Sequence, residues 1–259
     1  MRSPQGGTAV PVGSVPMSSE VPDVRDLTRP VSVPLRRLDE WAAGFRRRHG
    51  GVVITPMDPS EDGAPRWLLA GQDGERALIS VPAWLAGAVE DDRLAARPPS
   101  PRPDAYDGPV FGVLMVRRAG YAAAVFAGGA KREAKVGKRH IHGRTAAGGW
   151  SQQRYARRRG HQADEIVGAA AHAFTAIVGP DAETLAVLVT GGDRQLLAAA
   201  RDSLGENSRV GRVLAGLPEV HLGIGTPTPQ VLAGVPDRVL AVSVLLADGS
   251  IPEPEGDER

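Results

Sequence analysis

The chain has 259 residues, of which 42% are hydrophobic and 24% charged, and it contains no cysteine. This composition is typical of a soluble globular protein, and it excludes a fibrous protein, a disulfide framework, a zinc ribbon, an iron–sulfur centre and a thiol nucleophile. No apolar run approaches the roughly 18 residues that a membrane span needs. Residues 1–16 also lack the apolar stretch of a secretory signal, so we expect a cytoplasmic protein with no membrane partner.

The net charge is only +1, but the charges are unevenly distributed along the chain. Residues 131–159 carry ten basic residues against the single acidic Glu133, a net charge of +9, whereas the other 230 residues carry 21 basic and 29 acidic ones, net −8. An acidic body with one basic stripe favours the docking of a polyanion on one face, and a solvated surface run is the alternative. The ten are Lys131, Arg132, Lys135, Lys138, Arg139, Arg144, Arg154, Arg157, Arg158 and Arg159.

Composition divides the chain into two predicted domains. Residues 1–30 are rich in Pro, Gly and Ser, which predicts a disordered tail. Residues 31–92 predict a small α/β domain, since apolar side chains recur at helical spacing from Leu35 to Phe45 and short apolar runs follow. A proline-rich stretch within residues 93–108 predicts an extended linker. The predicted strands of the first domain are 52–54, 67–69 and 77–81.

Residues 109–250 predict the second domain, a mixed sheet with helices packed on it, so the chain as a whole is of the α/β class. Apolar runs at 110–116 and 121–126 predict a hairpin, and a third, solvent-edged strand is expected within 131–142. A long helix from about residue 151 to 178 carries an apolar stripe. The remaining predicted elements are a buried strand at 184–190, a helix at 194–204 capped by Asp193, strands at 220–224 and 239–246, and a polar tail at 251–259.

The stretch before the long helix carries the residues that point to chemistry. It contains Gly148 and Gly149, followed by Trp150, Ser151, Gln152 and Gln153. Paired glycines allow a backbone to enter a tight cavity, and free N–H groups at a helix start can face an anion or a developing oxyanion. A glutamine amide both donates and accepts, so it can orient a water molecule. The alternative is that the glycines only form a loop before a helix.

Arginines follow within the first turns of the predicted helix. Arg154, Arg157 and Arg158 share one helical face and can therefore hold phosphates. The stretch offers no strong nucleophile and no general base of ordinary type, so catalysis would depend on positioning, with acid–base groups supplied by the substrate. His140 and His142 have a spacing suited to a metal on a strand, but no third ligand is evident, and we expect neither a metal nor a cofactor.

This stretch resembles the catalytic domain of the eukaryotic and archaeal class-one peptide release factors. That family has His-Gly-Arg shortly before Gly-Gly-Gln, then a Ser and an Arg-aromatic-Ala-Arg-x-Arg helix. Here residues 142–144, Gly148 with Gly149, Ser151 and residues 154–159 fit that order. The hairpin before the stretch and the long helix after it also fit.

The sequence departs from that pattern at two places. Residues 145–147 are inserted before the glycines, and Trp150 occupies the position of the family's glutamine. The Gly-x-x-Gln at 149–152 is instead similar to that of the VLRF branch, the release-factor-like peptidyl-tRNA hydrolases of ribosome rescue. The resemblance covers roughly residues 109–248, and residues 1–108 show no counterpart of a stop-codon-reading domain.

The resemblance implies cleavage of the ester that joins a nascent peptide to tRNA in the peptidyl-transferase centre of the large ribosomal subunit. Gln152 would position the attacking water or line the site, with Gln153 as the alternative, and Gly149 would give the loop its conformation. Two other functions stay open: a nuclease acting on tRNA in the same context, and a non-catalytic ribosome- or RNA-binding protein. The residues expected to contact RNA are Lys138, Arg139, Arg144, Arg154, Arg157, Arg158 and Arg159.

Overall fold

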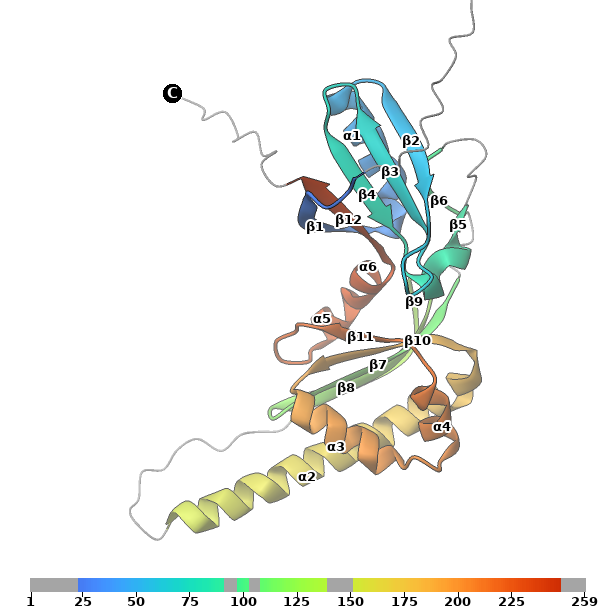
Figure 1. Cartoon of the computed structure of the whole chain (residues 1–259). Coiled ribbons are helices and arrows are strands. Elements are labelled where there is room, and N and C mark those ends of the chain that lie inside the picture. Colours follow the sequence, from blue (N-terminus) through green and yellow to red (C-terminus); the bar gives the residue numbers. More distant parts are fainter. Residues whose placement is uncertain (1–22, 91–96, 103–107, 139–150, 248–259) are drawn as a thin grey trace, which may run out of the picture.

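The computed structural model describes residues 23–90, 97–102, 108–138 and 151–247, which form two five-stranded sheets (Figure 1). The first sheet has the strand order β1-β12-β4-β3-β2, and the second has the order β11-β10-β7-β8-β9. A short pair, β5 (Val89–Glu90) with β6 (Ser100–Pro101), lies beside them. The predicted α/β class, with one mixed sheet and helices packed on it, is confirmed.

The first sheet is antiparallel throughout. The helix α1 (Leu38–His49) follows the short 3-10 helix η1 (Leu35–Arg37), and both contribute buried side chains to the core cluster that contains Trp67 and Ile79 of the sheet. The strands of this sheet are β1 (Leu27–Pro34), β2 (Val52–Met57), β3 (Arg66–Gly71), β4 (Arg76–Ser80) and β12 (Ala241–Ala247).

The predicted tail of residues 1–30 is wrong at its C-terminal end, because β1 begins at Leu27. The strand pairs with β12 along its whole length, and Leu27 and Val33 are buried. Pro30 was assigned to the disordered tail, yet β1 tolerates both Pro30 and Pro34 because it is an edge strand. Residues 1–22 lie outside the described part of the chain.

The strand expected at 239–246 forms as β12, but it belongs to the first sheet and not to the second. It lies between β1 and β4, with Val244 opposite Val31 on one side and Ile79 on the other. Apolar periodicity predicts a strand but not its pairing partners. The sequence therefore placed this strand in the sheet that is nearer along the chain. Residues 109–250 therefore contribute to both sheets, and the chain returns to complete the first one.

The second sheet joins an antiparallel meander to two parallel strands. The strands β7 (Val110–Arg117), β8 (Gly120–Ala127) and β9 (Ala130–Lys138) pair in order, while β10 (Leu185–Gly192) runs parallel to both β7 and β11 (Glu219–Leu222). The predicted hairpin and solvent-edged strand are thus confirmed. Phe111 and Phe126 are paired across the hairpin and stack with their ring centroids 5.1 Å apart.

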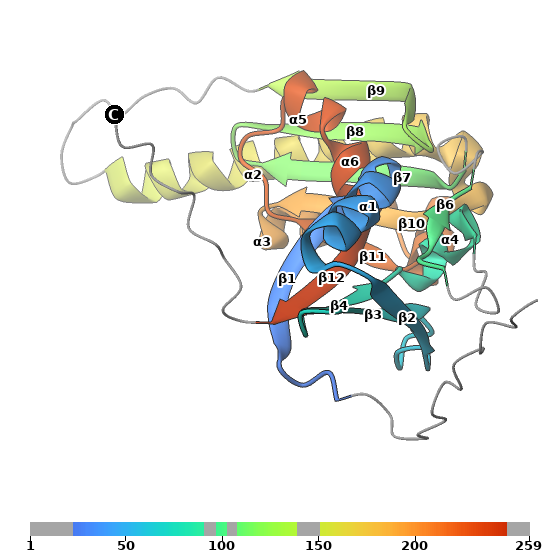
Figure 2. The same cartoon turned by 90° about the horizontal axis from the view of Figure 1, so that it is seen from above.

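Three helices cover one face of the second sheet (Figures 1 and 2): α2 (Ser151–Val178), α3 (Arg194–Leu204) and α4 (Arg209–Ala215). A short 3-10 helix, η4 (Gly179–Thr184), links α2 to β10. The predicted cap of α3 is confirmed, because the carboxylate of Asp193 accepts hydrogen bonds from the backbone N–H groups of Gln195 and Leu196. Such a cap satisfies donors that the helix itself leaves free.

The other face of the second sheet meets the first sheet through a shared core. Buried side chains of η2 (Ala83–Ala88), α5 (Pro229–Ala233) and α6 (Val235–Val239) belong to the same cluster as Phe111 and Trp67. Since one continuous cluster contains residues of both sheets, the two sheets are held together by apolar burial.

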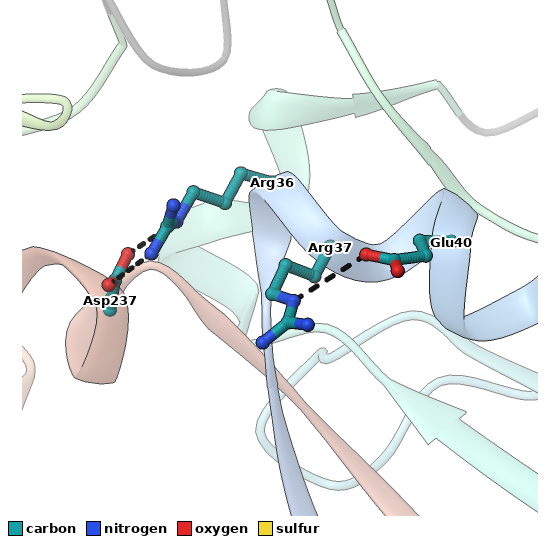
Figure 3. Close-up of polar contacts among 4 residues, drawn as sticks. All are labelled: Arg36, Arg37, Glu40 and Asp237. Carbon is teal, nitrogen blue, oxygen red and sulfur yellow. Dashed lines mark hydrogen bonds and ion pairs between the residues drawn. The ribbon is translucent and has the colours of Figure 1, made fainter.

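Polar contacts add to this junction (Figure 3). Arg36 of η1 donates from Nε and Nη2 to the two carboxylate oxygens of Asp237 on α6, at 2.7 and 2.5 Å. In the same view, Nε of Arg37 lies 3.6 Å from a carboxylate oxygen of Glu40, three residues further along the chain. The backbone N–H of Leu35 donates to the carbonyl of Leu240 at 2.7 Å. The Arg36 pair is bidentate but exposed, so we assign it a positioning role more than a large stabilisation.

Because β12 lies in the first sheet, a polar substitution of its fully buried residue Val244 should strongly destabilise the protein. Val244→Asp should lower the free energy of unfolding by about 3–5 kcal/mol, because it buries a carboxylate without a partner. Ser243→Asp, at the exposed neighbouring position, should change it little. Thermal unfolding followed by circular dichroism measures both variants, and equal midpoints would contradict the placement of β12.

Candidate functional site

The segment with the predicted chemistry connects β9 to α2. β9 ends at Lys138, and α2 begins at Ser151. Gly149 lies outside the described residues, as do Arg139 and Arg144. Gln152 and Gln153 are the second and third residues of α2, and Arg154, Arg157, Arg158 and Arg159 follow on the same helix, with side chains outside the described part of the structure.

The described side chains that anchor α2 to the body lie in its C-terminal half. The helix has 28 residues, which corresponds to about 42 Å at 1.5 Å per residue. Its N-terminal half extends beyond the end of the second sheet in both views (Figures 1 and 2). The anchoring side chains, which include the whole predicted stripe, are Ile166, Val167, Ala170, Ala171, Ala173, Phe174, Ile177 and Val178.

The sequence of α2 explains why half of it projects. From residue 151 to 161 the only apolar residues are Tyr155 and Ala156, so this half has no stripe to bury against the sheet. From Ala163 onward, apolar residues recur at helical spacing and join the core cluster. Gln152 stands about 20 Å along the helix axis from Ile166, the first residue of α2 that the structure describes as buried. The structure thus carries the predicted glutamine and arginines on an arm.

β9 fixes the other end of the segment. It is an edge strand of the second sheet, and Lys138 at its end lies opposite Gly120 of β8. Gly137 packs directly against the ring of Tyr121, since a Cβ added at Gly137 would come within 2.2 Å of Cε1. This close approach requires glycine, and it lets the last residues of β9 lie close to β8. Lys138 itself is exposed.

A second polar cluster lies on the helix-covered side of β10 and β11. Thr190, a fully buried polar residue, donates from Oγ1 to Glu219 at 2.7 Å, and its oxygen lies 3.0 Å from Nδ1 of His221, which therefore donates. Glu219 also forms an ion pair with Arg201 of α3. Because the hydroxyl is enclosed, it cannot attack a substrate. The cluster ties α3 to the edge strand β11, and no pattern in the sequence signalled it.

Two carboxyl groups have lowered pKa values, and both belong to loops of the first sheet. A hydrogen bond from the Ser60 hydroxyl lowers the pKa of Asp62, and a hydrogen bond with His49 lowers the pKa of Asp73. Both groups are solvent-exposed and support turns, so they do not mark a catalytic centre. Within the described residues no group of three His, Asp or Glu could hold a metal ion. His140 and His142 lie outside them.

Comparison with known proteins identifies the family. The family model of the Actinobacteria/chloroflexi VLRF1 release factor matches residues 109–245. This range is more than half of the chain, begins just before β7, ends within β12 and includes the Gly-x-x-Gln at 149–152. The chain belongs to this release factor family, and the resemblance noted in the sequence is confirmed.

Two solved structures match the chain at low sequence identity and low TM-score. The crystal structure of an archaeal translation termination factor, aRF1, matches at 14% identity and a TM-score of 0.34, covering 76% of this chain and 61% of that one. A structure described as an archaeal protein matches at 13% identity and a TM-score of 0.34, covering 80% and 62%. The chain thus spans about three-fifths of the length of these structures. No curated protein matches the sequence.

None of the described helices is long and apolar enough to cross a membrane.

Proposed function

We propose that the protein is a peptidyl-tRNA hydrolase that acts on stalled, ribosome-bound peptidyl-tRNA. The observation that carries the proposal is the family match across residues 149–152, a Gly-x-x-Gln segment that leads directly into the projecting half of α2. An arm with a polar, basic surface suits entry into a confined site walled by RNA, because it has no apolar face that must stay buried.

The chemistry is hydrolysis of the ester between the nascent peptide and the terminal ribose of tRNA. The oxygen of a water molecule attacks the ester carbonyl, the bond to the ribose oxygen breaks, and that oxygen takes the proton. Gln152 orients the water through its amide, while backbone N–H groups at the start of α2 face the developing oxyanion. Gly149 gives the preceding backbone its conformation. Acid–base groups come from the substrate.

RNA binding is the role of the basic residues on both sides of the segment. Lys138 lies before it, and Arg139 and Arg144 lie within it. Arg154, Arg157, Arg158 and Arg159 follow on the arm, where phosphate contacts hold it in the large subunit. The proposal implies a cytoplasmic protein that is monomeric when it is off the ribosome, and it needs neither a metal nor a cofactor.

Gln152→Ala should reduce peptide release by about 100-fold or more, the loss typical of removing one well-placed polar group from a preorganised site. Gln153→Ala is the matched control and should be milder, since the next residue on a helix points about 100° away. Release of labelled peptide from ribosome–nascent-chain complexes measures both. Gly149→Ala should also be damaging, through the backbone.

Two results would contradict this assignment in different ways. If Gln153→Ala abolishes release while Gln152→Ala is near normal, Gln153 is the positioning residue. If neither variant changes release while binding to the ribosome persists, the catalytic role of the segment is wrong.

The arginines of α2 should make binding to the ribosome depend strongly on salt concentration. With about five or more phosphate contacts, the logarithm of the binding constant should fall with the logarithm of salt concentration by several units per decade. Replacing Arg157, Arg158 and Arg159 together with Ala should flatten this slope by about two units, since each contact contributes about 0.7–0.9. Sedimentation with ribosomes over a salt series measures the slope. An unchanged slope would show that the RNA-binding face lies elsewhere on the protein.

A further inference from the structure

Exposed cations gather at the end of the second sheet where β9 finishes. Arg117 ends β7, Arg118 lies in the turn between β7 and β8, Lys138 ends β9, and Arg194 opens α3. All four residues are exposed. We call this set the basic rim. Its three arginines, from the end of β7, the turn after it and the start of α3, lie outside the basic stripe of residues 131–159.

The topology of the sheet places the rim residues in a row. Gly120 pairs with Arg117 on one side and with Lys138 on the other, so β7, β8 and β9 end at one level. The backbone N–H of Asp193 donates to the carbonyl of Val116 at 2.9 Å, which brings the start of α3 alongside the end of β7. With neighbouring strands about 4.8 Å apart, the row spans about 15 Å.

Among the described residues, three of the four rim cations have no acidic partner. Arg118, Lys138 and Arg194 form no ion pair with any described residue. The carboxylate of Asp193, the neighbouring acid, is engaged in the cap of α3. Elsewhere on the second sheet and its helices, arginines do have acidic partners: Arg132 with Asp181, Arg201 with Glu219 and Arg209 with Glu183.

Arg117 is held in place without losing its charge. Its guanidinium donates to the backbone carbonyl of Ile224, a neutral acceptor. Gly192 makes room for the side chain, because a Cβ there would lie 3.1 Å from Cγ of Arg117 and 2.2 Å from the carbonyl oxygen of Val116. Gly192 has a φ of 109°, which favours glycine. The sheet therefore presents a fixed cation at the centre of the row.

We infer that the basic rim is a second RNA-binding surface, which contacts the phosphodiester backbone of RNA beside the base of the α2 arm. A row about 15 Å long, whose cations form no ion pair with the described residues, suits consecutive phosphates of one strand. The inference rests on the proposed function, because that function places the protein on the ribosome. It adds Arg117, Arg118 and Arg194 to the residues that bind RNA, and it makes the body of the protein, as well as the arm, part of the interface.

The test uses the full chain with Arg118→Ala and Arg194→Ala combined, because both residues are exposed and lie outside the 131–159 stripe. The control combines Arg46→Ala and Arg48→Ala, which removes two exposed arginines from α1 on the first sheet. Binding is measured over a salt series with vacant large subunits and, separately, with deacylated tRNA. The rim pair should flatten the salt slope by about 1.5 units, whereas the control should leave it unchanged.

The pair Arg118→Lys with Arg194→Lys should restore the slope, because it keeps the charge, and circular dichroism should match the unmodified protein in every variant. A change seen with vacant subunits identifies ribosomal RNA as the source of the phosphates, and a change seen only with tRNA identifies tRNA. Equal loss in the rim and control pairs, or a slope that the rim pair leaves unchanged, overturns the inference.

Release by the unmodified protein, measured in parallel, separates this inference from the proposed function. If the unmodified protein releases peptide while the rim pair binds with an unchanged slope, the rim is not an RNA surface and the proposed function stands. If the unmodified protein neither binds ribosomes nor releases peptide, the proposed function fails and the inference fails with it.

Discussion

Burial of the second sheet on both faces is the constraint on which the rest of the structure depends. Along β7, Phe111, Val113 and Met115 join the core shared with the first sheet, while Leu114 and Val116 join the core under the helices. A strand covered on both faces is apolar along most of its length, and β7, β8 and β10 are, with Thr190 of β10 as the buried polar exception. One face thereby anchors α2, and the other fixes the first sheet, which β12 completes.

The division of α2 into an anchored and a projecting half follows from the same burial. Only the part of the helix that lies over the sheet can bury apolar side chains, and the sequence changes character accordingly near Ala163. The projecting half carries like charges at positions 154 and 158, one turn apart, an arrangement that destabilises an isolated helix by a few tenths of a kcal/mol. Phosphates would relieve that repulsion, which supports the proposal that the arm contacts RNA.

The local sequence pattern was sufficient to predict most helices and strands, but it did not predict which strands pair with one another. The limits of α3 and its Asp193 cap, the stripe of α2 and the hairpin of β7 and β8 were all predicted, because each depends on neighbours within a few residues. The place of β12 was missed, because pairing with β1 joins residues some two hundred positions apart. Of the candidate site, the sequence predicted Gln152 and the arginines of α2, and the structure places these residues at the start of that helix. The basic rim was missed, since Arg117, Arg118 and Arg194 are gathered only by strand register and by the turn into α3.

The state of the tRNA after reaction tests the central claim most directly. Ribosome–nascent-chain complexes carrying 5′-labelled peptidyl-tRNA are incubated with the protein, and the RNA is separated on a denaturing gel. Hydrolysis of the ester predicts full-length tRNA with a free 3′ end, together with released peptide. Shortened tRNA would show that a phosphodiester is cut instead, and intact peptidyl-tRNA on ribosomes that carry the bound protein would show that it binds without catalysing release.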